Sequence, residues 1–494
     1  MEKLYERLNE KIKKYCALQA SLTLFDYDMD TLAPSKAYVY SDEVMAILSK
    51  ESYDCLHNKE VDEILDKLDE TCLNPIQKAN VKELKRILDE TKGISKEQYL
   101  EYHQLLNESR RAFVKARKEN DYRLFAPCLE KIIDYKKMFV KAQETNELKG
   151  YDVLLNQYEP GMNQKDLDIF FDLIKEKLVP VVKCKYRKQN DEFLTGYFDK
   201  QKQIELSTFL ASYIGFDFEK GVMGESIHPY TTEIHNHDVR FTNDYDLHHL
   251  TNAMFSALHE GGHGIYEQNI ADDLTLTLVG HGASMMMHES QSRFYENCLG
   301  HSLEFWKPIF YKVQEYFPQL KEIDVETFVR GCGNVEPSLI RVDADEVTYP
   351  IHILIRYEIE KEMIEKDLEV FEIKEKWNKL YQDYLGIEVD CDNHGILQDM
   401  HWSGGMVGYF PTYALGSAIA SQIYMYLKKI NHLDEQLESG NVQEITKYLN
   451  DKIHQYGMTK TSKELLKNAI GEELDANVYV DYLINKVKMQ YNLD

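Results

Sequence analysis

One six-residue segment, Leu258-His259-Glu260-Gly261-Gly262-His263, constrains this chain more than any other stretch. Residues four apart share one face of a helix, so His259 and His263 can point both imidazoles at a single ion. Glu260 is rotated by about 100° from His259, close enough to reach a water on that ion without binding the ion. Two histidines, an adjacent carboxylate and an open position are typical of catalytic zinc sites in peptidases. The segment therefore predicts a metal-binding helix.

The residues around this segment also favour a helix. Thr242, Asn243 and Asp244 are candidate N-caps. Gly261 and Gly262 each cost about 1 kcal/mol in a helix relative to alanine, so we expect them to admit a substrate or a neighbouring helix. The alternative, a chance match of three fixed positions, is expected in well under about one chain in ten of this length. Apolar residues follow the caps at helical spacing: Leu247, Leu250, Met254 and Leu258.

A third metal ligand must come from outside this helix. The metzincin class of zinc peptidases would need a histidine at position 269, which is Asn269. The gluzincin class takes a glutamate from a later helix, and Glu289 lies in such a segment. We therefore predict His259, His263 and Glu289 as the zinc ligands. His288 is the alternative, although as the immediate neighbour of Glu289 it is expected to face another direction.

Composition favours one large, mainly helical unit. The 494 residues include only 11 prolines and 24 glycines, no linker-like stretch interrupts the helical pattern, and a hydrophobic content of 43% is ample for a core. We expect a single unit over 1–494, with a helical wall or lid half over about 1–200 and a zinc-bearing half over about 201–494.

Charge and cysteine usage bear on partners and location. The net charge of −26 argues against nucleic acid and anionic membranes as partners. The eight cysteines lie far apart with no CxxC pair, as is typical of reduced thiols in a cytosolic protein. The N-terminus lacks the apolar core of a signal peptide, and no run of 18 apolar residues occurs. We therefore expect a cytoplasmic protein without a membrane partner.

A short β-ribbon is predicted just before the zinc helix. Gly224–Tyr230 and Asp238–Thr242 are expected to form strands around a turn at Asn236. An extended peptide substrate could pair its backbone with such a ribbon. The alternative is a purely structural hairpin in which Asp238 and Arg240 form a local ion pair.

Five further motifs occur in order along the chain. They are His228-Pro229-Tyr230, Asp238 to Thr242 (DxRxT), His288 to Gln291 (HESQ), Ile340 to Asp345 (IRxxAD) and Gly395 to Trp402 (GxxQDxHW). With its HExxH segment, the chain thereby resembles the Taq-carboxypeptidase family of zinc metallocarboxypeptidases over essentially its whole length. Tyr230 replaces the phenylalanine usual in that family, and Phe25 to Met29 matches the family's opening segment weakly.

The resemblance implies both a fold and an activity. The implied fold is mainly α, like the neurolysin and angiotensin-converting-enzyme group, with a deep central cleft and the small β-ribbon beside the zinc helix. The implied activity is removal of single amino acids from peptide C-termini with broad specificity, by a homodimer. Two alternatives stay open: a zinc oligopeptidase that cuts inside peptides, and a non-catalytic peptide-binding protein.

The expected chemistry is metal-assisted peptide hydrolysis. One Zn²⁺ per subunit, for which Co²⁺ or Mn²⁺ could substitute, would lower the pKa of its water toward about 7. Glu260 is expected to take the water's proton as general base and pass it to the leaving amine. His401, from the GxxQDxHW match, and Tyr413, from its glycine-rich setting, are candidates to stabilise the oxyanion. For Tyr413 a packing role is the alternative.

An exopeptidase of this kind must also recognise a free carboxylate. A buried arginine is the natural anchor because a guanidinium binds carboxylates bidentately, and we predict Arg341 in that role. The alternative for Arg341 is a salt bridge to Asp343 or Asp345. Arg240 is the second candidate anchor. The matching motifs add His228 and Asp238 to the expected substrate-binding residues.

Three residues are expected to contact and orient the catalytic side chains without binding the metal or the substrate. Arg293 follows Glu289 by one helical turn and is predicted to orient that ligand. His288 is expected to pack behind the metal ligands. Asp399 is predicted to hold the tautomer of a histidine.

Overall fold

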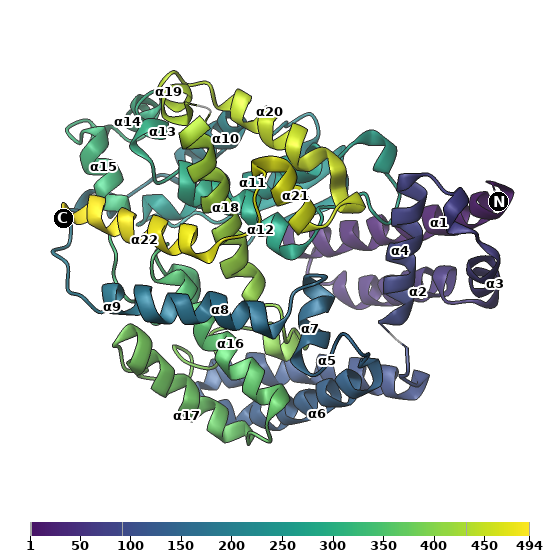
Figure 1. Cartoon of the computed structure of the whole chain (residues 1–494). Coiled ribbons are helices and arrows are strands. Elements are labelled where there is room, and N and C mark those ends of the chain that lie inside the picture. Colours follow the sequence, from purple (N-terminus) through teal and green to yellow (C-terminus); the bar gives the residue numbers. More distant parts are fainter. Residues whose placement is uncertain (1, 91, 431, 494) are drawn as a thin grey trace. The chain divides into compact units, whose positions relative to one another are not determined.

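Helices make up most of the computed structural model, which describes residues 2–90, 92–430 and 432–493 (Figure 1). The predicted mainly α fold is thus confirmed. The chain divides into two compact units, each built from three segments. The first unit comprises 1–88, 190–332 and 419–474, and the second comprises 89–189, 333–418 and 475–494. Each unit takes residues from both sides of the predicted division at about residue 200. A single catalytic unit with a deep cleft stays a prediction.

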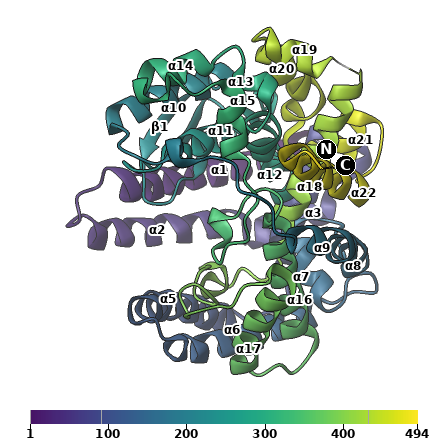
Figure 2. The same ribbon diagram turned by 90° about the vertical axis from the view of Figure 1, so that its left-hand side faces the viewer.

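The first unit holds the sheet and the helix with the HExxH segment. Its helices α1 and α2 lie side by side as an extended pair (Figure 2). Its elements are α1 (Glu2–Thr31), α2 (Tyr38–Leu56), α3 (Lys59–Lys67), α4 (Pro75–Asp89), α10 (Lys200–Ile214), β1 (Gly221–Glu225), β2 (Thr231–His235), β3 (Asp238–Asn243), α11 (Leu250–Gln268), α12 (Met285–Arg293), the π-helical turn η6 (Phe294–Leu299), α13 (Leu303–Trp306), α14 (Phe310–Tyr316), α15 (Val325–Cys332), α19 (Leu433–Glu438), α20 (Val442–Lys452) and α21 (Ser462–Ile470).

The second unit is helical throughout its regular structure. Within it, α5 and α6 lie side by side (Figure 1). Its elements are α5 (Lys96–Glu119), α6 (Ala126–Gln143), α7 (Tyr151–Tyr158), α8 (Gln164–Leu173), α9 (Val179–Val182), the 3-10 turn η8 (Arg341–Asp343), α16 (Tyr349–Glu365), α17 (Val370–Leu380), the π-helical turn η9 (Tyr381–Leu385), the 3-10 turn η10 (His401–Gly404) and α22 (Ala476–Tyr491). Helix α18 (Pro411–Ile430) begins in this unit and ends in the first.

The predicted β-ribbon is a three-stranded sheet in the order β1-β3-β2. Strand β3 pairs in parallel with β1 and antiparallel with β2, and the turn between β2 and β3 lies at Asn236, as predicted. The predicted strand over Gly224–Tyr230 is wrong in its bounds. Pro229 has no N–H to give to a ladder, and the Ser226 hydroxyl instead bonds the His228 carbonyl at 2.8 Å. The chain is therefore irregular between β1 and β2.

The start of α11 also differs from the sequence prediction. The helix begins at Leu250 without a side-chain cap, because the predicted caps are engaged elsewhere. Thr242 and Asn243 belong to β3, and Asn243 Nδ2 donates to the Ala253 carbonyl at 2.9 Å. Asn243 thus ties β3 to the first turn of α11 from outside the helix.

The two glycines of the HExxH segment have different surroundings. A Cβ on Gly262 would lie 2.9 Å from the Gln291 carbonyl oxygen and 2.9 Å from Ser292 Cα, both backbone atoms of α12. A Cβ on Gly261 would meet the flexible end of Ile214 at 3.1 Å. Gly262 therefore lets α12 approach α11 closely, which confirms the expected close approach of a neighbouring helix.

In the second unit, a buried carboxylate fixes the segment that follows the GxxQDxHW motif. Glu360 of α16 is fully buried and accepts hydrogen bonds from Tyr151 Oη and Trp402 Nε1, each at 2.7 Å, and from the Gly408 N–H at 2.9 Å. Burial raises the pKa of Glu360 to about 7. These bonds attach η10, the segment that follows it and α7 to one helix.

The search of the described residues for membrane spans found no helix that is both long and apolar enough to cross a bilayer.

We predict that Gly262→Ala destabilises the protein by about 1–3 kcal/mol, because backbone atoms cannot move aside for the added methyl group. Gly261→Ala is the matched control. Replacing glycine by alanine in a helix gains about 1 kcal/mol of helix propensity. The added methyl group meets only the flexible end of Ile214, so the stability of Gly261→Ala should equal or exceed that of the wild type. Denaturant unfolding of both variants tests this. Equal losses at the two positions would contradict the account of α11 and α12.

Candidate metal centre and arginine cluster

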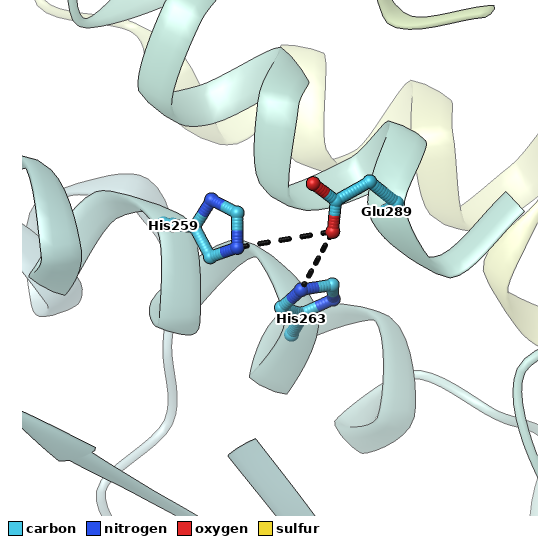
Figure 3. A group of neighbouring side chains, drawn as sticks. All are labelled: His259, His263 and Glu289. Carbon is cyan, nitrogen blue, oxygen red and sulfur yellow. Dashed lines mark ion pairs between the residues drawn. The ribbon is translucent and has the colours of Figure 1, made fainter. Parts of the chain in front are cut away.

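Three side chains of the first unit converge at the HExxH helix. His259 and His263 project from α11, and Glu289 reaches them from α12 (Figure 3). Glu289 Oε2 lies 3.9 Å from His259 Nε2 and 3.5 Å from His263 Nε2. One ligand atom from each residue lies within 4.8 Å of the others. The three residues predicted as ligands from the sequence are therefore brought together by two helices.

The other ring nitrogen of each histidine has its own hydrogen-bond partner. His259 Nδ1 lies 2.7 Å from Glu296 Oε2. His263 Nδ1 lies 2.5 Å from His288 Nδ1, and His288 Nε2 lies 2.8 Å from Glu267 Oε1. If His259 and His263 each carry the proton on Nδ1, the Nε2 lone pairs of both rings face Glu289. The donor set of two imidazole nitrogens and one carboxylate oxygen fits a catalytic divalent metal site.

Arg293 holds the carboxylates of this site. Its Nε donates to Glu289 Oε1 at 2.6 Å, and its Nη1 donates to Glu296 Oε2 at 3.0 Å. Burial raises the pKa of both carboxyl groups, but the charges of Arg293 and His259 together with hydrogen bonds from the neighbouring histidines outweigh it: the pKa of Glu289 falls well below its ordinary value, and that of Glu296 falls to about 2. Both side chains are therefore ionised at neutral pH. The predicted contact between Arg293 and Glu289 is present.

Glu260 is oriented by the sheet. The Thr231 hydroxyl on β2 lies 2.6 Å from Glu260 Oε2 and 3.0 Å from the Glu260 carbonyl oxygen. Glu260 is 7% exposed, and burial raises the pKa of its carboxyl group. The small sheet thus contributes to the site by fixing the carboxylate next to the first histidine.

Three predicted substrate-binding residues lie elsewhere in the first unit. Asp238 and Arg240 of β3 form a bidentate pair with two contacts of 2.8 Å. The Arg240 guanidinium also lies over the Tyr27 ring, 5.2 Å from its centroid. The local ion pair considered as an alternative from the sequence is therefore present. His228 is exposed in the segment between β1 and β2.

The second unit contains a buried cluster of two arginines around one aspartate. Arg341 Nε and Nη2 donate to Asp399 Oδ1 at 2.9 and 2.8 Å. Arg356 Nε donates to Asp399 Oδ2 at 2.7 Å. The alternative partners proposed for Arg341 were wrong, because Asp343 is exposed and Asp345 accepts hydrogen bonds from backbone N–H groups at the start of α16.

His401 and Tyr413 lie beside this arginine cluster. His401 Nε2 is 3.1 Å from the Tyr413 hydroxyl, and the Arg341 guanidinium lies 5.1 Å from the Tyr413 ring centroid. His401 Nδ1 is 3.9 Å from Asp399 Oδ1, too far for a hydrogen bond. Asp399 therefore binds two guanidinium groups and does not hold the His401 tautomer as predicted. Burial lowers the pKa of His401 to about 4, so the ring is neutral at pH 7.

Sequence reasoning missed five residues of these clusters, among them Arg356, the second arginine bound to Asp399. Glu296 follows Arg293 by three positions, so helical spacing could have identified it as a partner. Thr231 and Glu267 carry no comparable signal, because their roles depend on how β2 and the end of α11 pack. Gln398 lay inside a recognised motif; its Oε1 accepts from the Arg341 N–H at 2.8 Å.

The chain is similar over nearly its whole length to known carboxypeptidases. The model of a family described as carboxypeptidase Taq (M32) metallopeptidase matches residues 7–487. The chain is 39% identical over 499 aligned positions to carboxypeptidase 1 of Bacillus subtilis, covering 100% of this chain and 99% of that protein. It is 31% identical to thermostable carboxypeptidase 1 of Thermus thermophilus, covering 99% of each. A solved Pyrococcus furiosus carboxypeptidase structure is similar with a TM-score of 0.94 at 28% identity, covering 99% of each chain.

We predict that metal binding displaces a proton from His259. In the metal-free protein, burial lowers the pKa of His259 but Glu296 and Glu289 raise it more, to about 9, whereas burial lowers that of His263 to about 3. At pH 7 His259 is therefore charged and His263 is neutral. Binding should release about one proton from the protein, and metal affinity should rise about tenfold per pH unit up to about pH 9.

Calorimetry in buffers of different ionisation enthalpy measures this release. Glu296→Gln should reduce the release at pH 7, because the pKa of His259 falls when the neighbouring charge is removed. Glu315→Gln, at an exposed glutamate paired with Lys312, is the matched control and should leave the release unchanged. A pH-independent affinity between pH 6 and pH 8 would contradict the assignment.

Proposed function

Because the chain belongs to the carboxypeptidase Taq (M32) metallopeptidase family, we propose that it removes single amino acids from the free C-termini of peptides with broad specificity. The observation that carries this proposal is the convergence of His259, His263 and Glu289, with Glu260 oriented beside them. The family supplies the class of substrate, and the cluster supplies the chemistry that peptide hydrolysis requires.

His259, His263 and Glu289 hold the metal ion in this proposal. Zinc is the proposed ion, one per subunit, because two imidazoles and one carboxylate are its common catalytic ligand set; Co²⁺ or Mn²⁺ can substitute. When bound, such an ion acts as a Lewis acid toward the scissile carbonyl and makes water a stronger acid. Glu267, through His288, keeps the His263 ring oriented toward the ion.

Glu260 is the proposed general base. Its buried carboxylate accepts a proton from the attacking water and passes it to the leaving amine. The raised pKa of Glu260 supports this role, because a carboxylate of higher pKa is a stronger base. The hydroxyl of Thr231 restrains the carboxylate in one orientation.

Arg341 is the proposed anchor for the substrate's terminal carboxylate. Arg341 and Arg356 share the single carboxylate of Asp399, so the cluster carries one net positive charge. That charge is complementary to one further carboxylate. His401 and Tyr413, hydrogen-bonded to each other beside Arg341, supply donors for the oxyanion in this proposal.

Further substrate contacts and the cellular setting complete the proposal. The further substrate-binding residues of this proposal are Arg240, the second candidate anchor, with Asp238 of β3 and His228 before β2. The protein acts as a homodimer in the cytoplasm. No disulfide joins any of the eight cysteines, all of which lie among the described residues, and this supports a reducing compartment.

The first test compares a blocked dipeptide with its C-terminal amide. We expect release of the terminal amino acid from the acid only, lost on chelation and restored by Zn²⁺ or Co²⁺. Glu260→Gln should keep the metal and lower kcat by about 10²–10⁴-fold. Equal cleavage of acid and amide would favour an oligopeptidase. Metal binding without cleavage of either would favour a peptide-binding protein.

The second test concerns the carboxylate anchor. Arg341→Lys should raise KM for the free acid by about 10–100-fold, because a bidentate charged hydrogen bond is lost. Arg356→Lys is the matched control: Arg356 shares Asp399 but is fully buried over the Trp377 ring. It should lower the melting temperature and leave KM within about twofold of the wild type, as expected for a packing role. An unchanged KM in Arg341→Lys would remove Arg341 as the anchor.

A further inference from the structure

A second group of metal-ligating side chains lies in the second unit, between η9 and η10. Asp390, Cys391 and His394 bring one carboxylate oxygen, one thiol sulfur and one imidazole nitrogen within 4.8 Å of one another. His394 Nδ1 is 2.8 Å from Asp390 Oδ1. The side chains of Asp390 and His394 are 61% and 49% exposed, so an ion can reach them from solvent.

The loop that carries these side chains is fixed by residues that are not themselves ligands. The Asp392 carboxylate accepts the Tyr122 N–H at 2.8 Å and pairs with Lys374 at 2.5 Å. The Asn393 N–H donates to Asn120 Oδ1 at 2.9 Å. Because the backbone between Cys391 and His394 is already held, an ion bound there would cost little loop ordering.

We propose that Asp390, Cys391 and His394 form a second divalent metal site, selective for Zn²⁺ and Co²⁺ over Mg²⁺ and Ca²⁺. Two residues separate Cys391 from His394, a spacing common between zinc ligands, and a thiolate ligand disfavours the harder cations. Binding replaces the Cys391 S–H bond with a metal–sulfur bond and releases the thiol proton to solvent. Water completes the coordination. The site shares no residue with the cluster on α11 and α12, so it does not depend on the proposed function.

Hydrogen bonds of one side chain, Gln398, connect this site to the arginine cluster. Gln398 Nε2 donates to the His394 carbonyl oxygen at 3.0 Å, while Gln398 Oε1 accepts the Arg341 N–H and a hydrogen bond from Arg356 Nη2, each at 2.8 Å. An ion bound to His394 therefore restrains residues 394–398, the segment whose Gln398 side chain positions Arg341.

Titration of the metal-free, full-length protein with Co²⁺ tests the proposal. The ligands on α11 and α12 include no sulfur, whereas Co²⁺ bound by Cys391 gives a thiolate-to-metal charge-transfer band in the near ultraviolet. We expect this band, and about two ions per chain at saturation. Cys391→Ser and His394→Gln should each remove the band and lower the stoichiometry to about one ion. His259→Gln should leave the band in place.

Cys72→Ser is the matched control for loss of a thiol. Cys72 is exposed and donates to Asp69 Oδ2 at 3.7 Å, yet it belongs to none of the metal-ligating groups found among the described residues. Its substitution should leave the band unchanged. Saturation at one ion without the band, or a band that survives Cys391→Ser, would overturn the proposal.

Discussion

The guanidinium of Arg293 is the fixed charge around which the candidate metal centre is built. It pairs with Glu289 and Glu296, two buried carboxylates that would otherwise be costly to ionise. Glu296 then orients His259, and Glu289 faces both Nε2 atoms on α11. Removing one partner from such a buried group costs about 3–5 kcal/mol, so Arg293 contributes to stability as well as to ligand geometry.

The charges around this guanidinium favour a dication. When His259 is neutral, Glu260, Glu289 and Glu296 oppose the single positive charge of Arg293 and leave an excess of two negative charges. Without a metal, the proton on His259 offsets part of that excess, which explains the raised pKa of its ring. The arginine cluster of the second unit has the opposite balance, because Asp399 neutralises only one of its two arginines. One unit thus favours a divalent cation and the other favours an anion.

Helical spacing made the shared direction of His259 and His263 predictable from sequence, whereas contacts between elements were not predictable. His259 and His263 follow from one face of a helix, and Arg293 follows from its position one turn after Glu289. The hydrogen bond from Thr231 to Glu260 depends on a strand that begins after Pro229, and the sequence pattern misplaced that strand. The aspartates considered as alternative partners of Arg341 were also wrong, because Asp343 and Asp345 are near it in sequence whereas its actual partner, Asp399, is not. Contacts such as Thr231–Glu260 and Arg341–Asp399 depend on how distant segments pack, which the pattern of a single sequence does not reveal.

X-ray absorption at the zinc edge, with one Zn²⁺ added per metal-free chain, tests the central claim most directly. The account predicts imidazole nitrogens and carboxylate or water oxygens at about 2.0–2.2 Å, with no sulfur at about 2.3 Å. It also predicts that His263→Gln weakens the imidazole scattering. A sulfur neighbour at this loading that survives Cys391→Ser, or a spectrum unchanged by His263→Gln, would show that His259, His263 and Glu289 do not hold the ion.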